Sequence, residues 1–396
     1  MLFKKDELRI LWPFYLHALI YGLSMIIFPF MIIYFRNLGF SFFQIAVLWS
    51  AFSISSFLFE IPTGAFADGF SRKYSTILGL FLAGTAILLI PLSNNFYLLI
   101  FLWSFVGFGM TFISGAQESW VVDNLNHYNR KDLSQEFFIK NYSISSIGMI
   151  FAPIIGAFIV KNSALRILWL VSGAGFLMGA FILTLFATEM YKPKKLSIIN
   201  SLKKTWKNSK EGVRFSLSHR TVFLLILGSV FIGLLLFGEN GWQPFMVNLS
   251  MPQYALGFVY SVVAIGWVLC PFIPKLFKKL SVIKAVVIVI IVRMMLLFSV
   301  LLIRPPFYLL AAAVLVFDQS FKAMSDPLLF NYIHNFIPTR IRATIISIKS
   351  MSIQIAAALS GLIAGVLQDI LGPQIVLALG GLFGVFAIAT FLKIKD

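Results

Sequence analysis

Long apolar runs without a formal charge follow one another along this chain of 396 residues. A helix that crosses a bilayer needs about 20 apolar residues to span about 30 Å of hydrocarbon. The first run, 10–35, is too long for the core of a signal peptide, so we interpret it as a retained span. The other uncharged runs lie at 37–59, 74–117, 141–160, 167–188, 221–238, 240–274, 350–368 and 370–392. Apolar residues make up 59% of the chain and charged residues only 12%, about half the charge of a soluble domain, which excludes a water-soluble globular fold.

Turn signals raise the number of predicted spans above the number of runs. Pro91 and Asn94 divide the 74–117 run into two helices, and Pro252 divides the 240–274 run in the same way. Two further spans, near 284–303 and 306–334, contain charged residues. The sequence therefore predicts an all-α membrane protein with twelve transmembrane helices.

Lysine and arginine predict the orientation of these spans. Of 32 such residues, the segments on the side of the N-terminus hold 25 and the opposite loops hold four. Because basic residues favour the cytoplasmic side, we expect both termini in the cytoplasm and the chain in the inner or plasma membrane. The net charge of +17 is spread over short clusters between spans rather than one soluble face, so we expect no nucleic-acid partner.

Two similar halves flank the longest polar stretch. We predict an N-terminal six-helix bundle at 1–188, a basic cytoplasmic linker at 189–220 and a C-terminal six-helix bundle at 221–396. The linker has apolar residues at near-helical spacing, which indicates an amphipathic helix on the membrane surface. Three short motifs recur in the same order on both sides of it: Pro29-Phe30-Met31 as Pro244-Phe245-Met246, Leu38-Gly39-Phe40 as Leu256-Gly257-Phe258, and Asn124-x-x-His127 as Asn331-x-x-His334. Such parallel repeats are typical of transporters that bind substrate near the bilayer midplane between two pseudo-symmetric bundles.

The segment between the second and third spans reads Gly64-Ala65-Phe66-Ala67-Asp68-Gly69-Phe70-Ser71-Arg72-Lys73. It resembles the signature loop of the major facilitator superfamily, although Gly69 replaces a usual base and Ser71 a usual glycine. The resemblance implies that Asp68 meets the N-terminal end of the eleventh helix near Ala343, which closes the cytoplasmic side. Gly64 would allow a close helix approach. Arg72 needs an acid, and Asp123 at the inner end of the fourth span is the best placed. The predicted cytoplasmic gate consists of Gly64, Asp68, Arg72, Lys73 and Asp123; the alternative is an ordinary tight turn with solvated charges.

A second motif lies in the fifth span. Gly148, Pro153 and Gly156 stand in a pattern that resembles the antiporter motif of the same superfamily, with Ala152 and Ala157 in place of two glycines. The resemblance implies export by exchange, typically of amphiphilic molecules against protons. The alternative is a small-residue packing face with a proline kink, which either transport direction needs.

Ionisable residues inside spans are costly and are therefore candidates for function. The proton-coupling candidates are Glu118, Asp318 and Glu60, with a structural hydrogen bond as the alternative for Glu60. Arg293 lies at a depth similar to that of Asp318 and is expected to pair with it, either for function or to fix two helices. The substrate-cavity candidates are His17, Tyr21, Glu239, Asn240, Trp242, Lys322, Asp326 and Arg293. For His17 the alternative is satisfied packing, and for the segment around Trp242 it is a ragged helix end.

Together with these patterns, the resemblance implies a secondary transporter that works by alternating access and exports a small organic molecule in exchange for protons. Uptake by proton symport, or facilitated diffusion, is the alternative. We expect no enzymatic activity, cofactor or metal site, because the four histidines and the single cysteine are scattered. A channel or receptor is disfavoured by the duplicated halves and the gate-like loop. We expect the lipid bilayer, a small molecule and protons as partners of a monomer.

Overall fold

The computed structural model describes residues 3–190, 210–277, 280–338 and 341–394. Regular structure within these ranges is helical, and they contain no strand. In the described part, 11 helices are long and apolar enough to cross a membrane. Helix α14 (Tyr308–Ile333) is the twelfth span. It has 26 residues, which is long enough to cross a membrane, but it carries the charged side chains of Asp318 and Lys322 and is less apolar than the other 11. The predicted fold, twelve transmembrane helices in two six-helix bundles, is thus confirmed.

The structure divides into two compact units whose boundary does not follow the linker alone. Unit 1 comprises Met1–Tyr34, Val47–Ile198 and Leu256–Ser261, and unit 2 comprises Phe35–Ala46, Ile199–Ala255 and Val262–Asp396. The predicted domain limits at 188 and 221 stay a prediction. In the predicted amphipathic linker, residues 210–218 are helical, and 191–209 lie outside the described residues.

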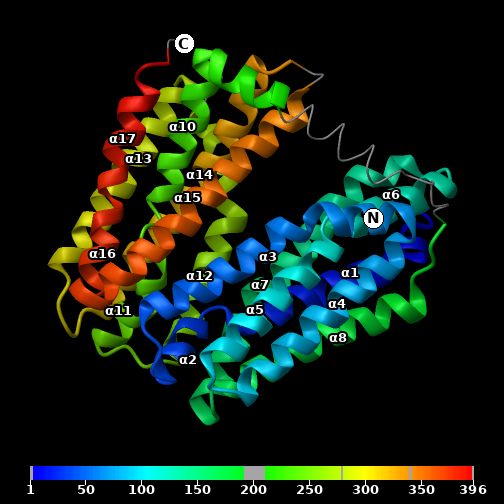
Figure 1. The fold of residues 1–396 in the computed structure, drawn as a ribbon, viewed down its shortest axis with the longest axis horizontal. Coiled ribbons are helices and arrows are strands. Elements are labelled where there is room, and N and C mark those ends of the chain that lie inside the picture. Colours follow the sequence, from blue (N-terminus) through cyan, green and yellow to red (C-terminus); the bar gives the residue numbers. More distant parts are fainter. Residues whose placement is uncertain (1–2, 191–209, 278–279, 339–340, 395–396) are drawn as a thin grey trace. The chain divides into compact units, whose positions relative to one another are not determined.

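The helices of unit 1 are labelled in Figure 1. They are α1 (Glu7–Ser24), the first half of α2 (Met31–Asn37), most of α3 (Phe42–Gly69), α4 (Arg72–Leu89), α5 (Phe96–Ile113), α6 (Ala116–His127), α7 (Ser134–Asn162) and α8 (Arg166–Phe186). Residues that indicate turns in the sequence cap helices in the structure. Asn95, for example, ends the α4–α5 connection by accepting a 3.1 Å hydrogen bond from the backbone amide of Leu98.

Unit 2 contains the remaining helices. They are α10 (Arg220–Leu234), α11 (Trp242–Asn248), most of α12 (Ala255–Leu269), α13 (Val282–Ser299), α14, α15 (Arg342–Leu371), α16 (Pro373–Gly380) and α17 (Leu382–Phe391). The seventh span is interrupted between α10 and α11, where Gly238 has a φ of 78°. Only glycine adopts this left-handed conformation readily, which explains the residue type at the break.

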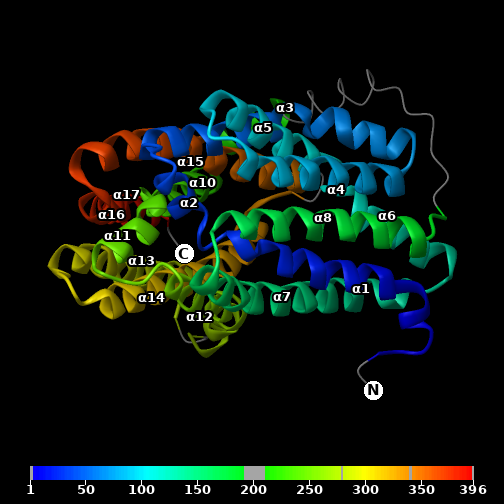
Figure 2. The ribbon, with the colours of Figure 1, turned by 90° about the horizontal axis from the view of Figure 1, so that it is seen from below.

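Small residues set the distance between the helices of unit 1. Figures 1 and 2 show α1 beside α7, and α4 beside α8. A Cβ atom on Gly148 of α7 would lie 2.7 Å from the carbonyl oxygen of Leu19 and 2.8 Å from the amide nitrogen of Leu23, both in α1. In lipid, where no hydrophobic force drives helices together, such close backbone contact supplies much of the packing energy.

We predict that Gly148→Ala destabilises the protein by about 1–3 kcal/mol, the usual range for overpacking a tight contact. Gly64→Ala serves as the matched control, because no described atom lies within 4 Å of the position of its Cβ. Thermal unfolding in detergent, followed by tryptophan fluorescence, measures both. Equal midpoints for the two variants would show that the α1–α7 crossing does not depend on glycine.

Candidate functional site

The signature loop is organised around the guanidinium group of Arg72. Its Nη1 donates to the carboxylate of Asp123 on α6 and, at 3.0 Å, to the carbonyl oxygen of Ser119. Its Nη2 donates to Asp68 at the end of α3 over 3.1 Å. The Arg72 side chain is 16% exposed, so the ends of α3, α4 and α6 meet at a largely desolvated charge. The Arg72–Asp123 pair is the one that the sequence predicted.

Two other interactions of this loop stay predictions. No described atom lies within 4 Å of the position of a Cβ on Gly64, so the partner of the close helix approach predicted there is not assigned within unit 1. The predicted contact of Asp68 with the start of α15 would join the two units.

Glu189, three residues beyond the end of α8, holds the start of α4. Its carboxylate accepts from Ser71 Oγ at 2.5 Å, from the amide of Arg72 at 2.7 Å and from the amide of Lys73 at 3.0 Å. The first amides of a helix have no partner inside the helix and carry partial positive charge, so an anion there is stabilising. Sequence reasoning missed this residue because it assigned Glu189 to the linker; its position directly after an uncharged run was the available signal.

The side chain of Lys73 completes the connection in the opposite direction. Its Nζ donates to the carbonyl oxygens of Thr184 at 3.0 Å and Ala187 at 2.6 Å, at the C-terminal end of α8. A cation there complements the negative end of the helix dipole. Lys73 and Glu189 therefore join the start of α4 to the end of α8 by two sets of charge-assisted bonds.

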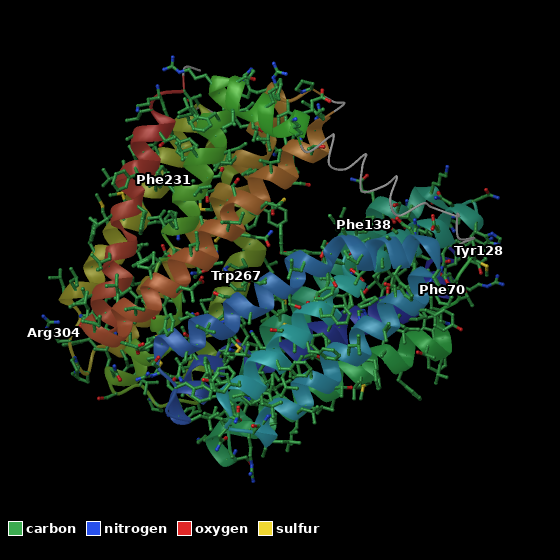
Figure 3. All side chains as sticks on the ribbon, in the orientation of Figure 1. Phe70, Tyr128, Phe138, Phe231, Trp267 and Arg304 are labelled. Carbon is green, nitrogen blue, oxygen red and sulfur yellow. The ribbon has the colours of Figure 1, made fainter. Side chains whose placement is uncertain are left out.

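The chain that leaves α8 is also fixed to α6. The carbonyl oxygen of Thr188 accepts from Trp120 Nε1 at 2.9 Å and from Asn124 Nδ2 at 2.8 Å, and Asn124 Oδ1 accepts from the amide of Met190 at 3.0 Å. Asn124 belongs to one of the repeated motifs. The stretch 187–190 is thus tied to the same helix end that carries Asp123. Phe70 in the signature loop and Tyr128 after α6 mark this end of unit 1 in Figure 3.

Glu118 lies just beyond a break in the fourth span. Helix α5 ends at Ile113, Gly115 has a φ of 69°, and α6 begins at Ala116. Glu118 is therefore in the first turn of α6, on the surface of unit 1. Among the described residues it forms no ion pair.

Glu60 has a neutral partner on the same break. Its Oε1 accepts a 3.0 Å hydrogen bond from Ser114 Oγ. The structure thus shows the hydrogen bond that the sequence left open as its alternative, with the carboxylate as acceptor rather than donor. Its part in proton coupling stays a prediction.

His17 is buried beside the turn that carries Glu118. Its Nδ1 lies 3.4 Å from Nε2 of Gln117, and its ring faces that of Tyr21 at 6.2 Å. Gly179 of α8 leaves room for the ring, since a Cβ there would lie 2.8 Å from His17 Cδ2. The side chain is 3% exposed, and within the described part of the chain its Nε2 has no hydrogen-bond partner. The predicted candidates His17, Tyr21 and Glu118 are therefore neighbours.

Asp318 and Arg293 form a fully buried ion pair in unit 2. Arg293 Nε lies 2.8 Å from Asp318 Oδ1 and Nη2 lies 3.3 Å from Oδ2, and both side chains are 1% exposed. This is the partner that the sequence predicted for Asp318. A carboxylate held by a bidentate arginine fixes α13 against α14, which favours the structural interpretation of the pair. Lys322 is half-buried one turn later, and the side chain of Asp326 lies outside the described residues.

Glutamine side chains hold the interrupted seventh span. Gln368 Nε2 of α15 donates to the carbonyl oxygen of Gly238 at 2.7 Å, and Gln319 Nε2 of α14 donates to Glu239 Oε1 at 3.3 Å. A backbone break inside a membrane needs such partners. Sequence reasoning identified the break but missed both glutamines. Asn240 is half-buried. Trp242 is 2% exposed and packs near Phe245, so the structure shows core packing at this tryptophan rather than a free face for substrate.

The antiporter-like motif of α7 forms a packing face. Gly148 contacts α1, as described above, and a Cβ on Gly156 would lie 2.8 Å from the ring of Phe30. The carbonyl oxygen of Pro153 would lie 2.2 Å from a Cβ on Gly257, in the part of α12 that belongs to unit 1. The small residues are thus required for packing, and transport direction stays a prediction.

Comparisons with known proteins agree on one family. The model of the Major Facilitator Superfamily matches residues 14–348. The chain is 22% identical over 392 residues to an uncharacterized MFS-type transporter, YxaM of Bacillus subtilis (strain 168), covering 97% of this chain and 96% of that protein. The fold is similar to that of the nucleoside transporter NupG, with a TM-score of 0.77, 14% identity and coverage of 96% and 100%. It is also similar to a bacterial homologue of the human lysosomal transporter Spinster, with a TM-score of 0.75, 14% identity and coverage of 96% and 95%.

We predict that Glu189→Ala lowers the stability of the protein by about 1–2 kcal/mol, the cost of removing a helix cap. Asp132→Ala is the control, because Asp132 is an acid near the same end of unit 1 whose ion pair with Arg130 leaves its side chain 51% exposed. Thermal unfolding in detergent should show the larger loss for Glu189→Ala. Equal losses would mean that the cap on α4 adds nothing beyond surface charge.

Proposed function

We propose that this chain, which belongs to the Major Facilitator Superfamily, exports a small organic molecule in exchange for protons. The chain is a multi-pass membrane transporter rather than an enzyme. The transport cycle would proceed by alternating access. The protein would be a monomer in the inner or plasma membrane, with both termini in the cytoplasm. Proton symport into the cell and facilitated diffusion remain the alternative modes.

The position of Glu118 is the single observation that carries the proton-coupled mode. A proton carrier must exist in both protonation states during the cycle. Glu118 lies on the surface of unit 1 and, among the described residues, has no cationic partner that would hold it ionised. The positive end of α6 also offsets part of the cost of the anion in the membrane. Asp318, in contrast, is paired with Arg293 at 2.8 Å.

A buried polar atom near Glu118 supports a ligand-binding region in unit 1. His17 Nε2 is buried and has no hydrogen-bond partner among the described residues, and such a group costs free energy until a ligand or a water molecule satisfies it. His17 and Tyr21 are next to the helix turn that carries the carboxylate, so binding of a polar ligand there and proton release from Glu118 would influence each other. In unit 2, Glu239 and Asn240 at the break in the seventh span remain the candidates for contact with substrate.

The cytoplasmic gate rests on the Arg72 network. The pairs Arg72–Asp123 and Arg72–Asp68 hold the signature loop in one conformation within unit 1. We propose that Asp68, held in this position, binds the N-terminal end of α15 when the cytoplasmic side closes, as the family resemblance implies. Export rather than import is supported only by the resemblance of the α7 motif, so direction needs its own experiment.

We predict that everted membrane vesicles with an acidic interior accumulate the substrate, and that Glu118→Gln reduces this accumulation to the level reached without a pH gradient. Loss of the titrating carboxylate removes the coupling but not the passage of substrate, so exchange of labelled for unlabelled substrate persists. The measurement is uptake from a panel of small organic molecules, chosen by the growth defect of a deletion strain.

Glu60→Gln is the matched control, because Glu60 on α3 is a carboxylate near the same break that accepts a hydrogen bond from Ser114. Accumulation that survives Glu118→Gln would assign the proton to another group. Accumulation in right-side-out vesicles with an acidic exterior, and none in everted ones, would establish symport instead of export.

A further inference from the structure

Helix α3 is shared between the two units. Residues 42–46, its first turn, belong to unit 2, whereas residues 47–69 belong to unit 1. The end that belongs to unit 1 carries Asp68 and leads into the signature loop. Because α3 crosses the membrane, its first turn lies at the opposite face. A contact that holds the first turn in unit 2 therefore controls whether α3 stays attached to that unit at this face.

The local cap of α3 satisfies only part of its first turn. Ser41 and Gln44 form a reciprocal capping box: the amide of Gln44 donates to Ser41 Oγ at 3.1 Å, and the amide of Ser41 donates to Gln44 Oε1 at 2.9 Å. The amides of Phe42 and Phe43 have no partner in this box. Each needs an acceptor from elsewhere in the protein or from water.

Asp369, near the end of α15, supplies that acceptor. Its Oδ1 lies 2.8 Å from the amide nitrogen of Phe42, and its Oδ2 lies 3.0 Å from that of Phe43. Both oxygens of one carboxylate are thus engaged by two successive amides at the positive end of a helix, where an anion is most stabilised. Gly365, one turn earlier on α15, permits the approach, since a Cβ there would lie 2.9 Å from the carbonyl oxygen of Phe42.

Arg36, in the last turn of α2, completes this contact. Its Nη1 lies 3.9 Å from Asp369 Oδ1 and donates to the carbonyl oxygen of Phe40 at 2.8 Å. Its guanidinium carbon lies 4.5 Å from the centroid of the Phe42 ring. Arg36 is one of the few basic residues on the side opposite the signature loop. It offsets part of the charge of Asp369 and holds the loop that leads into the capped turn.

We propose that Asp369 is the gate carboxylate of the face opposite the signature loop, and that it releases the first turn of α3 when this face opens. The contact suits a switch, because water that enters at the open face can satisfy the amides of Phe42 and Phe43 in place of the carboxylate. This inference rests on the proposed alternating access. Asp68 of α3 would then cap the start of α15 at one face, and Asp369 of α15 caps the start of α3 at the opposite face.

The test uses the accessibility of the first turn. Ala46 is 3% exposed, and Ala46→Cys in a Cys270→Ser background gives a single reporter in the part of α3 that unit 2 holds. We expect Asp369→Asn to increase the rate of its labelling by a membrane-impermeant maleimide, added to intact cells, by about tenfold, the effect of about 1.4 kcal/mol on an opening equilibrium. An unchanged rate overturns the proposal.

Gln374→Ala is the matched control for Asp369→Asn. Gln374 Nε2 donates to the carbonyl oxygens of Val300 at 2.8 Å and Ile303 at 3.0 Å, so its loss removes a polar contact of unit 2 that does not involve α3. We expect its labelling rate to match that of the parent. Equal acceleration in both variants would indicate general loosening of unit 2 and would also overturn the proposal.

A backbone variant keeps the test decisive if Asp369→Asn fails to fold. Phe43→Pro removes the amide that donates to Asp369 Oδ2, and proline is tolerated in the first turn of a helix. Phe43→Ala removes the same ring but keeps the amide. We expect faster labelling only with proline; the same rate in both discards the gate assignment. The labelling result does not depend on Glu118, so loss of proton coupling in the vesicle experiment leaves this inference standing.

Discussion

The structure depends on one constraint of the bilayer: every backbone group that a helix leaves free must find a partner inside the protein or in water that enters it. This chain meets the constraint with side chains from distant helices. Glu189 caps α4, Asp369 caps α3 and Gln368 holds the break at Gly238. Each of these bonds joins residues more than 100 positions apart in sequence, so satisfying the backbone also connects the spans.

The ionisable residues in the spans divide into held and free groups. Arg72 and Arg293 each bind an acid and thereby fix helices within one unit. Removing one partner of such a pair leaves an uncompensated charge, which makes these residues poor choices for groups that change protonation. Glu118 differs because, within the described residues, nothing basic binds it. This contrast between held and free carboxylates is the physical basis of the proposed proton coupling.

The sequence predicted the parts of the fold that local pattern determines. Uncharged runs and turn residues predicted the spans, and position along a span predicted the pairs Arg72–Asp123 and Arg293–Asp318. The partners Glu189, Asp369 and Gln368 were not found, because capping a distant helix end leaves no pattern in a single sequence. The close helix approach at Gly64 stays a prediction, since the residue type permits close packing but does not show which neighbour uses it.

Alternating access is the central claim, and distances on the two faces test it most directly. Spin labels at Phe70 and Ser218 report on the predicted cytoplasmic face, and labels at Asn94 and Arg304 report on the opposite face, each pair with one label in each unit. Pulsed electron resonance in lipid nanodiscs, with and without a pH change, measures both pairs. The account predicts that one distance shortens when the other lengthens. Distances that stay fixed, or that change together, would contradict it.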